Sequence, residues 1–145
     1  MDTDLSDSKI NCLSEEIDYY LRKNFDYKTS VVNCNDFAIN AKRKKFDLYF
    51  RYNSPSLLFT QNTFIIARLI FSSTKKGNGT KLLKFLITLS SRYDFKNIGL
   101  EHANVDCKLF GEKLGFQSLE SSDDHMIVTV SNLKKVLNNR DVLTE

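Results

Sequence analysis

The chain has 145 residues, of which 41% are hydrophobic and 27% are charged, so it is long enough and apolar enough to bury the core of one ordinary domain. This composition excludes a disordered tail, a collagen-like repeat and a small disulfide-stapled domain. The formal net charge of +3 favours an anionic ligand but does not require nucleic acid as a partner.

The cysteines argue for a reducing compartment. Cys12, Cys34 and Cys107 are odd in number, widely spaced and without a CxxC pair, which fits neither a disulfide framework nor a zinc ribbon. The first eight residues are acidic, whereas a secretory signal needs a basic region followed by an apolar run. No stretch approaches the ~18 apolar residues that span a bilayer. We therefore expect a cytoplasmic protein without membrane association.

The apolar periodicity and the turn residues predict an alternation of helices and strands. The first half of the chain should begin with a helix from Ser14 to about Asn24, followed by strands over 37–41 and 46–52 that are joined by a turn at Lys42–Lys45. After a turn at Asn53–Ser56, we expect strands at Leu57–Thr60 and Thr63–Phe71. The second half should contain a helix at Thr80–Tyr93, a strand at Asn97–Glu101, a helix from Asn104 to Gly115, a strand at His125–Val130 and a helix at Asn132–Leu137.

This order predicts the α+β class. The unit from Thr63 to Glu101 reads strand, helix, strand, which is a crossover connection and implies at least one parallel pair. The strands before it are joined by short turns and should pair antiparallel. Because both faces of Thr63–Phe71 are apolar, we expect it to be a central strand covered on both sides. The prediction is one domain over residues 1–145, with a mixed, mostly antiparallel sheet flanked by helices.

The segment Ser72–Thr80 separates the central strand from the strongest helix, and it is suited to bind an anion. Gly77 and Gly79 allow a sharp turn, and the amides at the start of the helix attract phosphate. The alternative to an anion site is purely structural: the segment is then an ordinary helix start with turn glycines and solvated lysines. The segment lacks the GxxxxGK[ST] pattern of a P-loop, and Leu82 stands where the dinucleotide fingerprint needs its third glycine.

Two motifs together resemble the GCN5-related N-acetyltransferases. The segment Gly77–Leu83 after a central strand is similar to the coenzyme A pyrophosphate loop of that family, and Asn104–Phe116 resembles its later helix, N-x-x-A-x-x-F-Y-x-K-x-G-F. The resemblance covers about Thr63–Gln117, whereas residues 1–62 agree only in pattern. It implies an acyl-CoA N-acyltransferase fold and transfer of an acetyl group from acetyl-CoA to an amine.

The resemblance also implies which residues hold the cofactor. The central strand would polarise the thioester carbonyl, the loop amides would hold the pyrophosphate, and the later helix would lie near the pantetheine arm. The implied cofactor-binding residues are Ala67, Leu69, Phe71, Thr74, Lys75, Lys76, Gly77, Asn78, Gly79, Thr80, Asn104 and Phe110. The core for the cofactor is about residues 63–117, and residues 1–62 would form the acceptor side.

Two positions depart from the family pattern. Thr74 replaces the usual Arg or Gln at the first position of the loop, although Lys75 or Lys76 could supply the charge. Gly111 stands where many members have the tyrosine that protonates the departing thiolate, so that acid is missing. Members without it release the thiolate unassisted or through water.

Glu101 and His102 are the candidate bases, because they end the strand at the edge where acetyl group and amine should meet. The alternative interpretation is that both residues are simply exposed in the turn between the strand and the next helix. Cys107 should pack as a buried thiol rather than act as a nucleophile. We place His125 at the surface, and the two widely separated histidines give no metal site.

The main hypothesis is therefore an N-acetyltransferase that acts on an unidentified small molecule or peptide. The alternative is a catalytically degenerate binding or regulatory module with the same fold. A third hypothesis is nucleic-acid binding through Lys42–Lys45, but such a basic turn is usually solvated, so we do not expect nucleic acid as a partner. The sequence leaves open whether the protein is a monomer or a homodimer.

Overall fold

The computed structural model describes residues 2–52, 59–73, 76–120 and 122–144. Its elements are α1 (Asp2–Phe25), β1 (Asn33–Cys34), β2 (Ala38–Arg43), β3 (Phe46–Arg51), β4 (Thr63–Phe71), α2 (Asn78–Leu89), β5 (Asn97–Leu100), α3 (Val105–Lys113), β6 (Gln117–Leu119), β7 (Ser122–Thr129) and α4 (Val130–Thr144). The strands form one sheet in the order β1-β2-β3-β4-β5-β7-β6, in which β4 and β5 pair in parallel and the other neighbours pair antiparallel. The predicted α+β class with a mixed, mostly antiparallel sheet is confirmed.

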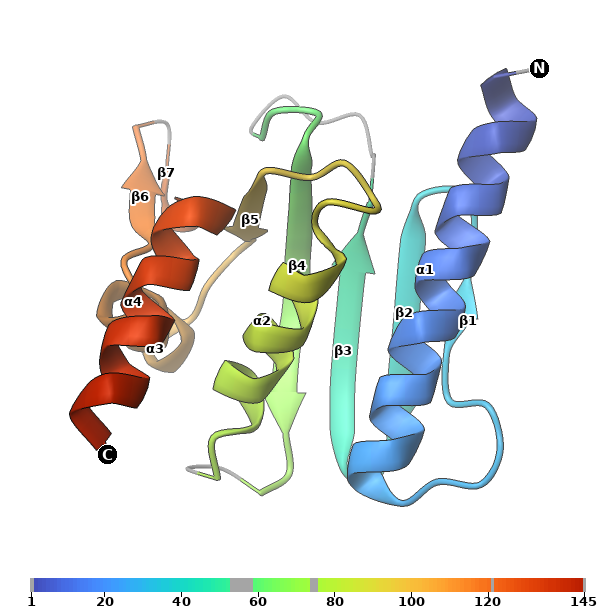
Figure 1. Cartoon of the computed structure of the whole chain (residues 1–145), viewed down its shortest axis with the longest axis horizontal. Helices are drawn as coiled ribbons and strands as arrows, with labels where there is room; N and C mark the ends of the chain where they lie inside the picture. The colour runs from blue at the N-terminus through green and yellow to red at the C-terminus, as the bar shows by residue number, and fades with distance from the viewer. Residues whose placement is uncertain (1, 53–58, 74–75, 121, 145) are drawn as a thin grey trace.

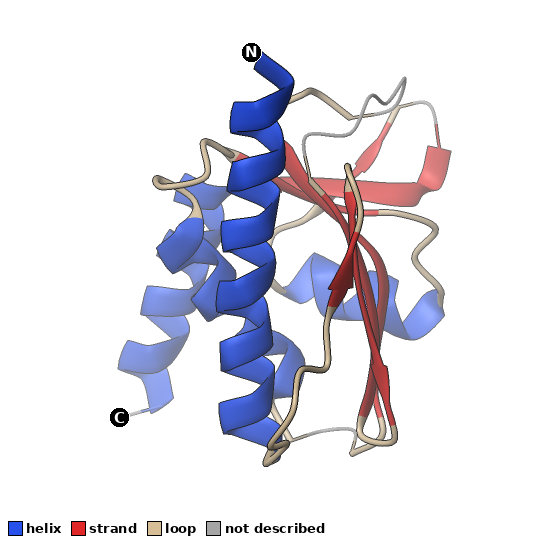
Figure 2. Cartoon of the chain, turned by 90° about the vertical axis from the view of Figure 1, so that its right-hand side faces the viewer, coloured by secondary structure: helices blue, strands red, loops and turns tan. Residues whose placement is uncertain are grey.

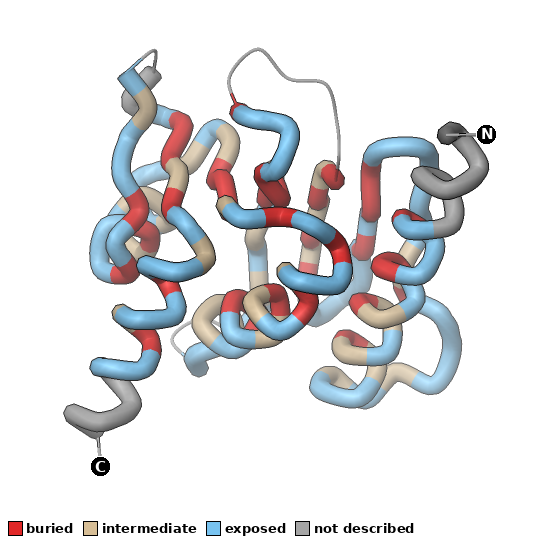
Figure 3. The backbone as a smooth tube through the Cα atoms, turned by 45° about the horizontal axis from the view of Figure 1, so that its top comes forward, coloured by how far each residue is buried: buried red, intermediate tan, exposed pale blue. Residues whose placement is uncertain are grey.

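Helices α1, α2 and α4 lie along one face of the sheet (Figures 1 and 2). Buried residues recur along the inner side of α1 and α2 (Figure 3), and the ring of Tyr20 on α1 stacks on Phe85 of α2 with 4.3 Å between centroids. Helix α3 packs on β5 and β7, where Gly111 lies against Leu100 and Met126. None of the helices, over the residues that the structure describes, is long and apolar enough to cross a membrane.

Helix α1 begins well before the predicted start at Ser14. Its buried stripe already includes Ile10 and Leu13 and continues through Ile17, so Ser14 is an interior residue that is itself buried. Acidic residues at the start of a helix are favoured by the macrodipole, which explains why the acidic segment joins the helix. The apolar stripe, rather than the polar residue, therefore sets the extent of α1.

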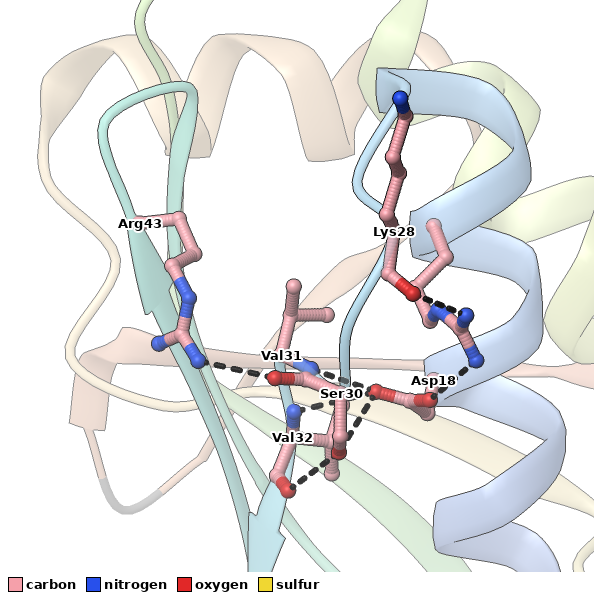
Figure 4. Close-up of polar contacts among 7 residues, drawn as sticks. Asp18, Lys28, Ser30, Val31, Val32 and Arg43 are labelled. Carbon is pink, nitrogen blue, oxygen red and sulfur yellow. Dashed lines mark hydrogen bonds and ion pairs between the residues drawn. The ribbon is translucent and has the colours of Figure 1, made fainter.

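Asp18 attaches α1 to the segment that leads into β1 (Figure 4). Its Oδ1 accepts hydrogen bonds from the amides of Val31 at 2.7 Å and Val32 at 3.2 Å, and from the hydroxyl of Ser30 at 3.2 Å. Arg22 lies on the other side, with 3.8 Å between its Nη1 and Oδ2 of Asp18. These contacts fix a segment that has no regular structure of its own.

Several predicted strands are shifted or incomplete. Phe37 precedes β2 and is 46% exposed, whereas Ala38 and Ile39 are buried. The predicted turn at Asn53–Ser56 and the first half of the predicted strand Leu57–Thr60 lie outside the described residues, and its second half is not a strand. Strands β1 and β6 were not predicted because they are only two and three residues long.

The later elements agree with the prediction more closely. Asn104 caps α3, since its Oδ1 accepts the amide of Cys107 at 2.8 Å, and Gly115 adopts the left-handed φ of 92° that ends the helix. Helix α2 begins two residues before the predicted Thr80 and ends at Leu89 rather than Tyr93. Strand β7 begins before the predicted His125 but ends at Thr129, because Val130 starts α4, and α4 extends beyond its predicted range at both ends.

Candidate functional site

The parallel pair β4–β5 diverges halfway along β4. The pairing runs from Thr63 opposite Asn97 to Ile66 opposite Leu100, and it closes with a bond of 3.0 Å from the amide of Glu101 to the carbonyl of Ile66. Strand β4 then continues beside β3 for five more residues, which no longer pair with β5. This part is half-buried or exposed, so the expectation that β4 is covered on both faces is right for its first half only.

A β-bulge in β4 reorients the backbone at the point of divergence. Phe50 of β3 lies opposite Ile66 and Tyr49 lies opposite Arg68, so Ala67 is an extra residue on β4. Such a bulge shifts which backbone groups face the neighbouring strand. The shift begins at the first residue beyond the parallel pairing.

Beyond the bulge, the backbone groups of Leu69 and Phe71 face away from β3. Ser72 donates its amide to the carbonyl of Lys45 at 2.9 Å, which identifies these two residues as a hydrogen-bonded pair. Because such pairs alternate along an antiparallel ladder, Ile70 directs its amide and carbonyl toward β3, and Leu69 and Phe71 direct theirs to the side that β5 has left. Backbone donors that face this side could polarise a carbonyl group.

Among the described residues, the first amides of α2 have no backbone acceptor. The first intrahelical bond joins the amide of Lys81 to the carbonyl of Gly77 at 2.9 Å, so the amides of Asn78, Gly79 and Thr80 have no acceptor within the helix. The first turn has no acidic residue, and the cap residue Gly77 has no side chain to offer. Such a helix start favours an anion.

The two glycines of this loop are needed for different reasons. Gly77 has a left-handed φ of 76°, and a Cβ there would meet nothing within 4 Å. A Cβ on Gly79 would lie 2.9 Å from the ring of Phe110, which reaches from α3 to the first turn of α2. Lys76 is exposed, whereas Thr74 and Lys75 lie outside the described residues.

The candidate bases have different surroundings. Glu101 is only 11% exposed at its side chain, and its two oxygens lie 2.6 and 2.7 Å from Nη1 of Arg51. His102 is exposed and adopts a positive φ of 51°. Its amide donates to Nδ1 of His125 at 3.1 Å, and the two imidazole rings are 4.5 Å apart. The structure thus places both candidates at the end of β5. Glu101 lies beside Arg51 and His102 beside His125, and neither contact was predicted from the sequence.

The placement of His125 at the surface is wrong. His125 is 4% exposed and contacts the ring of Phe59 on the sheet face where Gly99 also lies. Ala103 donates its amide to the carbonyl of Asp124 at 2.7 Å, so the start of β7 holds the turn between β5 and α3 at two points. No sequence signal near His125 indicates this contact, because its partners lie far away along the chain.

The remaining candidates are consistent with structural roles. Burial raises the pKa of the Cys107 thiol, which makes it a poor nucleophile at neutral pH. Gly111 is buried, and a Cβ there would lie 3.0 Å from Leu100 and 3.2 Å from Met126, so the position has no room for a tyrosine. Within the described residues, no three His, Cys, Asp or Glu side chains gather where a metal ion could bind, and the three cysteines are unpaired.

A separate shallow hollow of about 340 Å³ lies between α1 and α2, away from the loop before α2. Its lining residues are Cys12, Glu15, Glu16, Tyr19, Phe85 and Tyr93. Tyr93 donates a hydrogen bond to Glu16, and Arg92 forms an ion pair with Glu16 at 2.8 Å. The carboxylate of Glu16 is therefore already engaged within the protein.

No protein-family model and no curated protein matches the sequence. Solved structures share the fold. The KacTA–DNA complex superposes with a TM-score of 0.50 at 12% identity and covers 86% of both chains. The structure of AtaTR bound with AcCoA has a TM-score of 0.51 at 14% identity and covers 80% of this chain and 75% of that one. Because the first of these contains DNA, the comparisons do not support our expectation against nucleic acid as a partner.

Proposed function

We propose that this chain, whose fold is that of the GCN5-related N-acetyltransferases, moves an acetyl group from acetyl-CoA to the amine of a small molecule or peptide by direct attack. One observation carries the proposal. Strand β4 leaves its parallel partner after Ile66, and the free backbone groups of Leu69 and Phe71 lie just ahead of the glycine-bearing start of α2. Carbonyl polarisation and diphosphate binding would thus occur along one continuous segment.

The chain's own groups fit coenzyme A at each part of this segment. The amides of Asn78, Gly79 and Thr80 would bind the diphosphate, assisted by the charges of Lys75 and Lys76. The backbone of Ala67–Phe71 would receive the thioester carbonyl. Asn104 and Phe110 would contact the pantetheine arm, since the ring of Phe110 already reaches the first turn of α2.

Of the two candidate bases, we favour His102. Both oxygens of Glu101 are occupied by Arg51, whereas the imidazole of His102 is exposed and can reach an incoming amine. His102 would accept the proton of the attacking amine, directly or through water, and the C–S bond of the thioester would then break. The thiolate would leave without a protein acid, because Gly111 offers none.

The acceptor side is assigned to residues 1–62 and the cofactor side to about residues 63–117. The unpaired cysteines favour a reducing compartment such as the cytoplasm as the place of action. The protein would act as a monomer or a homodimer, without a metal cofactor.

Isothermal titration with acetyl-CoA tests the cofactor assignment, and thiol release across a panel of amines and peptides tests the chemistry. Saturable binding together with thiol release supports the proposal, whereas no heat at millimolar acetyl-CoA overturns it. Binding without turnover on a broad panel would instead favour a non-catalytic module of the same fold. The buried Gly111 in place of the usual acid is the observation that favours this second candidate.

A further inference from the structure

Three segments that are distant in the sequence meet at one end of the molecule. They are the end of α1 with residues 22–28, the β2–β3 turn with residues 42–45, and the start of α2 with residues 76–81, all at the lower edge of Figure 1. The carbonyl of Lys45 accepts bonds from the amide and the hydroxyl of Ser72, at 2.9 and 3.2 Å. The turn therefore lies directly beside the loop that leads into α2.

These three segments, which we call the basic end, carry a strong excess of positive charge. Their basic residues are Arg22, Lys23, Lys28, Lys42, Arg43, Lys44, Lys45, Lys76 and Lys81. Asp26 is the acidic residue among them, and the nearby Asp47 is paired with Arg68 at 3.1 Å. All six acidic residues of α1 lie at positions 2–18, and of these Asp18 is paired with Arg22 of the basic end at 3.8 Å. The small net charge of the chain thus conceals a polarised surface.

Some of the basic residues fix the turn, and others remain available. Nζ of Lys45 donates to the carbonyl of Phe25 at 2.7 Å, and Arg43 donates to the carbonyl of Ser30 at 3.0 Å. Lys42 and Lys44 are exposed, and their ammonium groups form no ion pair within the described part of the chain. The turn is therefore held in place while the side chains of Lys42 and Lys44 stay outside the ion pairs of the described residues, although Asp47 lies opposite Lys42 in the strand register.

We propose that the basic end binds the phosphate backbone of a nucleic acid. Regularly spaced phosphates would neutralise cations that repel one another in the free protein and would release their own counterions. A lipid surface fits less well, because the three segments contain none of the exposed large apolar side chains found among the residues whose burial is described, which are Tyr19, Phe37, Ile70, Val105 and Leu109.

The test uses the full chain and fluorescence anisotropy with a labelled RNA hairpin and a labelled DNA duplex, at about 50 and 200 mM salt. Binding should weaken steeply with salt. The double variant Lys42→Gln, Lys44→Gln should bind about tenfold more weakly and lower the logarithmic salt slope by about 2. Whichever of the two probes, the RNA hairpin or the DNA duplex, binds with the higher affinity identifies the kind of nucleic acid.

The matched control is Lys134→Gln, Lys135→Gln on α4, which removes the same charge from exposed positions outside the basic end. It should retain the affinity of the parent chain. The proposal is overturned if neither probe binds at low salt, if the control loses as much affinity as the turn variant, or if a polyglutamate peptide binds as tightly as the nucleic acids. Acetyl-CoA titration of the same variants keeps this result separate from the proposed enzymatic activity.

Discussion

Substituting Gly77 by alanine should weaken acetyl-CoA binding while the fold survives. A non-glycine residue with a left-handed φ costs about 1–2 kcal/mol, and the stiffer unfolded chain returns about 0.4–1 kcal/mol of this. Because a Cβ at Gly77 meets no atom within 4 Å, no clash adds to the cost. The net loss of about 1 kcal/mol should lower the melting temperature by about 4 °C.

The effect on the ligand should be larger than the effect on stability. If the altered turn misaligns one of the amides of residues 78–80, a charge-assisted hydrogen bond of about 1.5–3 kcal/mol is lost. The dissociation constant for acetyl-CoA should then rise about ten- to a hundredfold, measured by isothermal titration alongside thermal melts.

Gly115 provides the matched control for this substitution. Its φ of 92° is also left-handed, and a Cβ there would lie at an ordinary 3.5 Å from Val136, so Gly115→Ala imposes similar strain away from the loop. It should lower the melting temperature comparably and leave acetyl-CoA affinity unchanged. Equal affinities of Gly77→Ala and the parent chain, or an equal loss in Gly115→Ala, would refute the assignment of the loop.

Three further outcomes are expected. Asp18→Ala should reduce the free energy of unfolding in urea by about 2–3 kcal/mol, because it leaves the buried amide of Val31 without its acceptor. His102→Gln should lower kcat about a hundredfold or more with little change in acetyl-CoA affinity; an unchanged kcat would exclude it as the base. Burial and the hydrogen bond to Glu16 raise the pKa of Tyr93 above its ordinary value of 10.0, so the folded state holds the phenol proton more tightly than the unfolded state does. The free energy of unfolding should therefore fall as the pH rises above about 10, and Tyr93→Phe should flatten this dependence in urea titrations.

The sharp turn at Gly77 and the start of α3 at Asn104 could be predicted from the sequence because both depend on local chemistry. A glycine at a left-handed position and an asparagine before a helix impose their geometry through neighbouring backbone atoms. Gly77 accordingly forms a left-handed turn, and Asn104 and Gly115 bound the helix predicted between them.

Contacts between distant segments could not be predicted in the same way. Arg51 and Glu101 form their ion pair across fifty positions of the chain, and His125 meets His102 only because β7 inserts beside β5. The exposure of Phe37 in place of Ala38 likewise depends on the register of β2 against β3. Pairing geometry, rather than local propensity, decides these features.

The contact between Gly79 and Phe110 has a consequence for sequence variation in this fold. The ring touches the first turn of α2 because position 79 carries no side chain, so the sizes of the two residues depend on each other. A larger residue at position 79 should be accompanied by a smaller one at position 110, and the two positions should covary among homologous sequences.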